Sequence, residues 1–600
     1  MTTLPTGLTA DPRTGLPAEP SAAPEVAARR RESAVRARVA ELEDLLGDPS
    51  DPANPAGYTA LLEADRAAVP FAEGEALLDR FGIVDEYVPR SLGGRLDAMD
   101  TLVRVMRPVM RRDVGLAIGH GMTTFMAASD VWTTGSDRQR KWLAGLLRKG
   151  GRAAIAQHET AHSNDFVRSQ VTARRSPGGY LISGGKPLVN NLERAGALVL
   201  FCRTDPAPGS RSHSVLLLEP GQLSDARAAV TARRTPVGLR GCRFAGVEFD
   251  DCPVPDSALL GPEGSGIETA LRSFQISRTV IAGTAVAALD TSLRTAVRID
   301  REQSGGWQGR GIDGSRTGAA LTNAFVSLLL YDALAVVAAR ALHLLPAETS
   351  VSSAALKYLM PRVLSETMYD LSIVLGSDFY TREGTLGIFQ KHVRDVPVMS
   401  LGHAGTVACQ ATVIPQMPRL ARRSWFIEDE APAGLFRLDG DLPPLRADRL
   451  ALACGRDSLS ASLLAVAARI EGHGPVERAL RTLAGLLVEE FRDVRGRVLR
   501  LEAAGGASSA QPAKFALMDR YTLLLAAAAV LGVWDQARYG PDPFLADPSW
   551  AAAALHRICR RLGTRVTDLP PECETRIRHE VQLRFSTRAS YDLYSTPIPG

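Results

Sequence analysis

A block of short β-rich runs begins near residue 152 and separates two long helical regions. The runs AAIAQHET, SQVTARR, GYLISGG, ALVLFCR and HSVLLLE are divided by Gly, Pro, Asn and Asp, which is typical of a β-domain. The segment VEFDDCPVPDSALLG closes the block. The pattern therefore predicts a mainly helical protein with a small central β-domain at residues 151–262.

Helical periodicity occupies most of the remaining sequence. Residues 23–150 are predicted to form an N-terminal helical domain, and residues 426–600 a C-terminal helical extension. Between the β-domain and this extension, four helical blocks predict a four-helix bundle domain at residues 263–425. The blocks cover about 264–301, 314–345, 350–376 and 385–420. Residues 1–22 are rich in Pro, Thr and Gly and are predicted to be disordered.

Composition excludes several classes of function. The formal net charge of +4 is spread along the 600 residues, so neither nucleic acid nor an anionic membrane is an expected partner. The seven cysteines show no Cys-x-x-Cys pair and no zinc spacing, so we expect reduced structural thiols and no metal site. The first residues contain no apolar core of a signal peptide, and Leu523–Val533 is too short to span a bilayer. These features predict a cytoplasmic protein without a membrane span.

Six segments occur in the order and spacing of the landmarks of one flavoprotein family. They are ALLDRFGIVDEYVPRSLGG, TTGSDRQRKWLAGLLRKGG, AIAQHETAHSNDFVRSQVTARR, GYLISGGKPLVNN, VGLRGCRFAGVEFDDCPVPDSALLGPEGSG and FQISRTVIAGTAVAALD. Over roughly residues 60–410 the sequence resembles an acyl-CoA dehydrogenase. The resemblance implies an N-terminal helical domain, a small β-barrel-like domain, a four-helix bundle and, as in long family members, an extra C-terminal helical domain.

The resemblance also implies FAD as the cofactor. By comparison with the family, His158 and Asn190 stand at two strand ends that contact the flavin. Arg301 matches the arginine that reaches the FAD pyrophosphate of the neighbouring subunit, a role that suits a guanidinium. Gly376 and Thr406 complete the predicted cofactor contacts.

The predicted cofactor contacts depart from the family pattern at several positions. Family members usually have Thr at the positions of His158 and Asn190, Trp at Leu188 and Gln at Ile373. Histidine and asparagine can still form hydrogen bonds to the edge of a flavin. Loss of the tryptophan opens space beside the ring, which predicts a changed substrate or changed oxygen access.

The substrate implied by the resemblance is an acyl thioester carried by CoA or by an acyl-carrier protein. We expect it between the loop 158–165 and the first bundle helix, with Arg278 near its polar end. Asn164 matches a position that contacts the CoA phosphates, and Gln275 is a further predicted substrate contact. Hydrogen bonds to the thioester carbonyl would stabilise the developing enolate.

The position of the family's catalytic glutamate is occupied by Ala404 on our alignment. A second candidate, Glu383 in the run Arg-Glu-Gly-Thr, follows Gly376 by only seven residues, too few for the intervening helical turn and Arg-Asp pair. Arg394-Asp395 stands where that pair belongs, and Gly405-Thr406 follows it at nearly the family distance. We therefore interpret Ala404 as the lost base, with only its backbone N–H retained, and Glu383 as the alternative base.

Some family members carry the base on the first bundle helix, but that position here is Ser277. Three functions stay open: an acyl-thioester dehydrogenase with a relocated base, a flavoprotein of the same fold with other chemistry such as oxygenation, and a non-catalytic or flavin-free binding protein. Glu383, Asp378 and Glu159 are possible replacements for the base. The helical C-terminal extension predicts a homodimer. In long family members this extension occupies the surface that a second dimer occupies in the shorter, tetrameric members.

Overall fold

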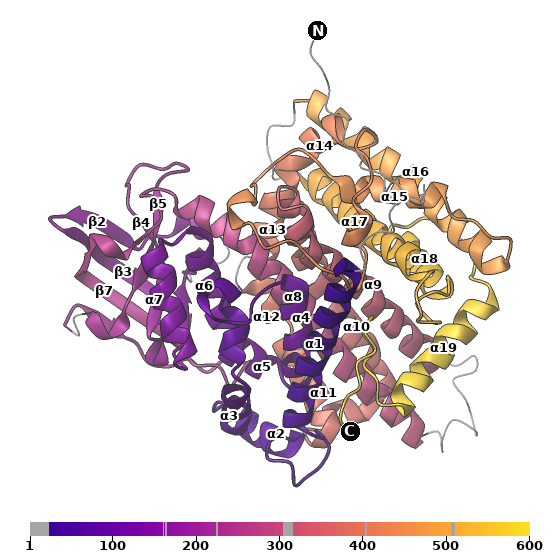
Figure 1. The fold of residues 1–600 in the computed structure, drawn as a ribbon, viewed down its shortest axis with the longest axis horizontal. Coiled ribbons are helices and arrows are strands. Elements are labelled where there is room, and N and C mark those ends of the chain that lie inside the picture. Colours follow the sequence, from indigo (N-terminus) through magenta and orange to yellow (C-terminus); the bar gives the residue numbers. More distant parts are fainter. Residues whose placement is uncertain are drawn as a thin grey trace, which may run out of the picture.

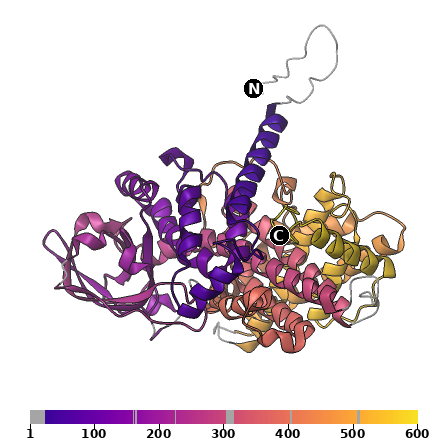
Figure 2. The same ribbon diagram turned by 90° about the horizontal axis from the view of Figure 1, so that it is seen from below.

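The computed structural model describes residues 23–159, 161–162, 165–223, 226–303, 316–402, 405–505 and 511–600. Figures 1 and 2 show a β-sheet at one end of the long axis, a central helical bundle, and the C-terminal helices at the opposite end. The predicted disorder of residues 1–22 and the predicted roles of Asn164 and Ala404 fall on residues outside the described ranges.

The N-terminal part of the described chain is helical. The breaks between its helices have local causes, as at Gly135-Ser136. Ser136 Oγ accepts a hydrogen bond from the Gln139 backbone, and the Gln139 side chain accepts one from the Ser136 backbone. This capping box begins a new helix. The helices are α1 (Ala23–Leu46), α2 (Tyr58–Ala67), α3 (Ala72–Phe81), α4 (Met99–Arg112), α5 (Val114–Leu116), a π-helical segment (Ala117–Met122), α6 (Thr123–Thr134) and α7 (Asp137–Arg148).

Eight strands of the described chain form one mixed sheet with the order β6-β7-β3-β2-β4-β5-β8, and β1 pairs in parallel with β4. The strands are β1 (Ala153–Ala156), β2 (Thr172–Ser176), β3 (Gly179–Asn190), β4 (Ala197–Arg203), β5 (His213–Leu218), β6 (Ala228–Val230), β7 (Phe244–Pro255) and β8 (Leu259–Leu260). The prediction of a barrel-like domain is wrong. In the described part β6 and β8 lie at opposite ends of the strand order and do not pair, so the sheet stays open.

Strand β4 shows how the sheet joins the helices. Val199 and Phe201 pack against α6, α7 and the start of α8, whereas Leu198, Leu200 and Cys202 pack within the β-domain. Both faces of this strand are therefore apolar, as expected for a strand covered on two sides. This packing places the ends of β1 and β3 beside the helical part of the molecule.

The central helices are α8 (Gly266–Gln303), α9 (Arg316–Leu344) and α10 (Thr349–Leu375). The predicted fourth block, 385–420, is not one helix. Pro397 and Gly402 interrupt it, because Pro397 has no backbone N–H to donate to the preceding turn and Gly402 is extended, with φ -85° and ψ 162°. The block divides into α11 (Gly384–Asp395), α12 (Val398–Leu401), α13 (Thr406–Val413) and α14 (Met417–Arg423). A 3₁₀ segment, Gly376–Tyr380, joins α10 to this region.

The C-terminal extension contains α15 (Ser458–Ala468), α16 (Pro475–Ala503), α17 (Pro512–Ala537), α18 (Ser549–Arg561) and α19 (Pro571–Ser586). With these helices in place, the predicted fold class is confirmed. Three described helices, α8, α9 and α17, are long and apolar enough to cross a membrane by length and composition, although their apolar windows are 83–100% buried within the fold. Leu523–Val533 lies inside the 26-residue α17, and the absence of a membrane span stays a prediction.

A buried lysine ties the bundle to the π-helical region and the β-domain. Lys391 of α11 donates to Asp113, at the start of α5, and to Asp395 at 2.6 Å. The other carboxylate oxygen of Asp395 accepts a hydrogen bond from the backbone of Leu239 at 2.6 Å. All three charged side chains are at most 5% exposed, so each charge depends on the others for compensation.

We predict that Lys391→Met destabilises the fold by about 3–5 kcal/mol, because it leaves two buried carboxylates without a cation. Chemical denaturation at pH 7 measures the change. The matched control is Arg422→Met, which removes a surface partner of Glu502 and should change stability by at most about 1 kcal/mol. Equal effects of the two substitutions would contradict this account.

Candidate functional site

Arg278 is the central residue of the candidate site. It lies on α8, is 1% exposed, and stands 5.2 Å from the centre of the Phe274 ring. Its Nη1 donates to Thr412 Oγ1 of α13 at 3.3 Å. Burial lowers the pKa of the guanidinium. The predicted substrate arginine therefore points into the interface between α8 and α13.

A second buried cation, Lys357 of α10, lies in the same region. It is 2% exposed, and burial, together with the charge of Arg278, lowers the pKa of its ammonium group to about 8. Cys409 of α13 acts electrostatically on both cations, and burial raises the pKa of its thiol in spite of them. Arg278 and Lys357 are called the cation pair below.

Within the described residues the cation pair has no acidic partner. Neither Arg278 nor Lys357 forms an ion pair, and Nε and Nη2 of Arg278 are buried without a hydrogen-bond partner. Buried charges are normally paired, so this site fits a negatively charged group. Sequence reasoning missed Lys357, although a lysine within the apolar run AALKYLM is a signal that could have identified it.

The predicted flavin contacts on the sheet are only partly accessible. Asn190 is 8% exposed; its Nδ2 donates to Thr123 Oγ1 at 2.8 Å, and its Oδ1 accepts from the Arg243 backbone at 3.0 Å. Both ends of this amide are thus engaged within the protein. His158 is half-buried, and Leu188, beside an irregular step in the β3–β7 ladder, is 48% exposed.

The remaining predicted cofactor contacts lie on the bundle. Ile373, near the end of α10, is 64% exposed, and Gly376 has a φ of 58° with open space where a side chain would project. Thr406, the first residue of α13, is half-buried. Arg301 lies near the end of α8, with its guanidinium 5.0 Å from the centre of the Phe585 ring. Apolar contact at Leu188 and Ile373, and the charge of Arg301, fit an FAD, whereas both polar atoms of the Asn190 side chain are already bonded within the protein.

Glu159, one of the possible replacement bases, is held in a structural network. It accepts hydrogen bonds from Ser169 Oγ at 2.5 Å, from the backbones of Gln170 and Val171, and from Lys186 Nζ at 2.9 Å. Burial alone would raise its pKa, but Lys186 and these hydrogen bonds lower it to about 2. Such a carboxylate is a weak proton acceptor at neutral pH.

Glu383 is separated from Arg278 along the bundle, and the side chain of Gln275 is already engaged by other residues of the protein. Glu383 is exposed at the start of α11, two residues before Thr385, which lines a small cavity with Arg298. Arg298 follows Arg278 by twenty residues on α8, about 30 Å along the helix axis. Gln275 is 1% exposed, accepts from Thr349 Oγ1 at 2.5 Å, and donates to the carbonyl of Ala451 at 3.0 Å.

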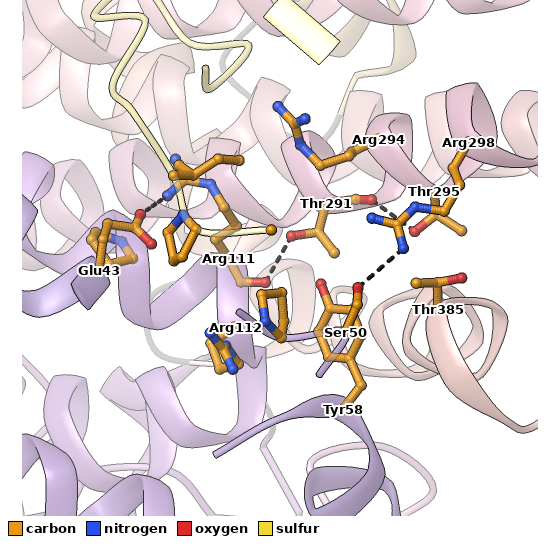
Figure 3. A pocket seen from close by; sticks show the side chains of 15 residues that line it. Glu43, Ser50, Tyr58, Arg111, Arg112, Thr291, Arg294, Thr295, Arg298 and Thr385 are labelled. Atoms are coloured by element: carbon orange, nitrogen blue, oxygen red, sulfur yellow. Dashed lines mark hydrogen bonds and ion pairs between the residues drawn. The ribbon is translucent and has the colours of Figure 1, made fainter. Parts of the chain in front are cut away.

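The small cavity beside Thr385 is shown in Figure 3. Arg111, Arg112, Arg294 and Arg298 surround it, with a volume of about 30 Å³. The dashed lines in the figure include the bond from Arg298 Nη1 to Ser50 Oγ at 3.0 Å. The cavity is too small for an acyl thioester, and we assign it no substrate.

A larger groove lies on another side of α8. It has a volume of about 920 Å³ and runs between the 89–97 segment, α6, Ile276 of α8 and the 442–448 segment. Ile276 and Arg278 are two positions apart, or about 200° around the helix axis, so the groove and the cation pair occupy opposite faces of α8.

Asp130 of α6 is a buried acid that sequence reasoning missed. It is 4% exposed, its Oδ1 has no hydrogen-bond partner among the described residues, and burial raises its pKa to about 7 in spite of a contact with Ser273 of α8. Asp378 is half-buried in the 3₁₀ segment after α10. The two predicted base positions, 404 and 277, are occupied by Ala and Ser, so neither position carries an acidic side chain.

Known proteins similar to this chain are acyl-CoA dehydrogenases and related enzymes. The mitochondrial isovaleryl-CoA dehydrogenase of Oryza sativa is 27% identical over 199 residues, which are 33% of this chain and 48% of the relative. The chain thus spans about half the length of the curated relatives that it matches. No protein-family model matches the sequence.

Solved structures resemble the chain over more of its length. An acyl-CoA dehydrogenase of Bacillus anthracis complexed with FAD has a TM-score of 0.66 and 14% identity, covering 92% of this chain and 95% of its own. The prolyl acyl carrier protein oxidase AnaB has a TM-score of 0.56 and 17% identity, covering 64% of this chain and 98% of its own. The fold is that of acyl-CoA dehydrogenases. The resemblance to this family that the sequence motifs indicated is confirmed.

The Glu159–Lys186 network yields a stability prediction. Because the pKa of Glu159 is lowered from 4.5 to about 2, its stabilising effect is complete at neutral pH and is lost as pH falls from about 5 to 2. Glu159→Gln should therefore destabilise the protein by about 3 kcal/mol at pH 7 and weaken its acid sensitivity in that interval. Denaturation curves at pH 7, 5 and 3 test this, with Glu263→Gln, at an exposed ion pair, as the control.

Proposed function

We propose that this protein is an FAD-dependent oxidoreductase that acts on the CH–CH group of an acyl group held as a thioester of CoA or of an acyl-carrier protein. The observation that carries the proposal is the position of Arg278. The arginine of the first bundle helix is buried and directed at α13, the helix that begins two residues after the predicted base position. The similarity to acyl-CoA dehydrogenases supports the same assignment.

The residues that would hold the cofactor are Arg301, at the pyrophosphate, and Leu188, Ile373, Gly376 and Thr406, around the ring system. When bound, FAD would supply the acceptor for the β-hydride of the acyl group. Because the Asn190 side chain is bonded to Thr123 and to the Arg243 backbone, apolar contact beside the ring would take the place of a hydrogen bond from Asn190 to the flavin. His158 completes the proposed set of contacts at the end of β1.

We further propose a cytoplasmic homodimer. Exposed apolar side chains gather on α10 and on the segments that follow it, and such surface marks an interface. The residues are Tyr369, Tyr380, Leu401 and Val407, each between 56% and 78% exposed. A second copy of the chain is the proposed cover for this surface.

The substrate thioester is proposed to lie along α8 near Arg278, with Asn164 at the CoA or carrier phosphates. The residue at position 404 would bind the thioester carbonyl through its backbone N–H, which any side chain retains. The proton acceptor is either weak or relocated, because positions 404 and 277 carry no acid. Neither oxygenation nor a non-catalytic role gains support from the comparisons.

Purified protein should carry FAD, which its absorption spectrum reveals, and should have the mass of two chains in solution. Arg301→Ala should lower FAD retention about tenfold or more, because a charge-assisted contact to the pyrophosphate is worth roughly 1.5–3 kcal/mol. Arg497→Ala, at a surface pair with Asp493, is the control. Protein that contains no flavin, and takes up none when FAD is added, would refute the cofactor assignment.

Reduction of the flavin by acyl-CoA should be slow in the natural protein and faster after Ala404→Glu. A positioned general base contributes roughly 10²–10⁴-fold, and a dye-reduction assay detects a gain of this size. Glu383→Gln should change the rate little, whereas loss of activity in Asp130→Asn would identify a relocated base. Rapid reduction in the natural protein that only Glu383→Gln abolishes would show that Glu383 is the base.

A further inference from the structure

The cation pair is the clearest unexplained feature of the described chain. Arg278 of α8 and Lys357 of α10 are 1% and 2% exposed, and the two side chains interact electrostatically with each other and with Cys409. Two buried cations repel each other and lose their hydration, so an arrangement without an anion is unfavourable. Other buried cations have acceptors within the protein: Lys391 meets Asp113 and Asp395, and Arg112 donates to the carbonyls of Ala56 and Gly47.

The described groups around the cation pair supply no negative charge. Burial raises the pKa of the Cys409 thiol, so this group is neutral. Thr412 Oγ1 accepts from Arg278 and donates to the carbonyl of Ala408 at 2.8 Å, so it too is neutral. Because no acidic side chain among the described residues compensates the two cations, a bound anion would complete the charge balance.

The free donors of Arg278 indicate the shape of that anion. Nη1 is occupied by Thr412, whereas Nε and Nη2 have no hydrogen-bond partner among the described residues. Nε and Nη2 form one edge of the planar guanidinium, and this edge matches the two oxygens of a carboxylate. The ammonium of Lys357 can add a third contact as a point charge.

We propose that Arg278 and Lys357 bind a carboxylate carried by the acyl group of the substrate. This inference rests on the proposed function and narrows the substrate class to thioesters of dicarboxylic acids.

Titration calorimetry of the FAD-loaded protein tests the proposal with matched ligands. Each ω-carboxyacyl-CoA of four to six carbons is compared with the methyl-ended acyl-CoA of equal chain length. We expect the carboxylated ligand to bind roughly 10- to 100-fold more tightly, the effect of a charge-assisted hydrogen-bonded contact. The preference should disappear in Arg278→Gln and in Lys357→Met, which retain much of the side-chain volume, and persist in Arg272→Gln on α8.

The dependence on pH gives a second readout in the unmodified protein. The ammonium of Lys357, whose pKa is about 8 with Arg278 and Cys409 as its titratable neighbours, is charged below that value. The preference for the carboxylated ligand should therefore decline as pH rises above 8, with proton uptake on binding. Lys357→Met should remove this dependence.

The outcomes separate the inference from the function on which it rests. Equal affinity for carboxylated and methyl-ended thioesters would overturn the inference and leave the proposed function intact. Failure of both ligand types to bind would overturn both. A preference that survives Arg278→Gln and Lys357→Met would show that the carboxylate binds elsewhere, which also overturns the inference.

Discussion

A buried charge cluster at the centre of the molecule fixes the helices on which the candidate site is built. Arg107 and Arg111 of α4 meet Asp290 of α8, Asp332 of α9 and Asp592 of the C-terminal segment, with Arg111 Nε 3.2 Å from Asp290 and Arg107 Nη1 3.2 Å from Asp592. The carboxylates also accept backbone hydrogen bonds from the C-terminal segment. Removing one partner of such a cluster costs about 3–5 kcal/mol, so the relative placement of four chain segments depends on it.

This cluster fixes the position of α8, the helix that carries Arg278. Asp290 follows Arg278 by twelve residues, about 18 Å along the same helix, so a helix held firmly at its middle presents the arginine to α10 and α13. The two regions differ in charge compensation. Each cation of the cluster meets carboxylates, whereas Arg278 and Lys357 meet none among the described residues. That contrast distinguishes a structural use of charge from a binding use.

The sequence predicted the order of helices and strands because apolar periodicity and Gly or Pro breaks are local signals. It failed where contacts between distant segments decide the outcome. The side chain of Asn190 is engaged by Thr123, sixty-seven residues away, and Glu159 by Lys186, twenty-seven residues away, so neither engagement is visible in the local sequence. The burial of Lys357 could have been inferred from its apolar neighbours in the sequence, but its lack of an acidic partner among the described residues could not.

The acids of the chain illustrate how environment selects a proton acceptor. Glu159 is surrounded by donors and has a pKa of about 2, so it holds a proton too weakly to accept one at neutral pH. Asp130 is buried and meets no cation among the described residues, and its pKa of about 7 matches the range in which a general base is most effective. It contacts Ser273, only five residues before Arg278 on α8. Asp130 and the cation pair, which meet no opposite charge among the described residues, thus lie beside the first third of α8. Such an arrangement is expected where a bound substrate completes the charge balance.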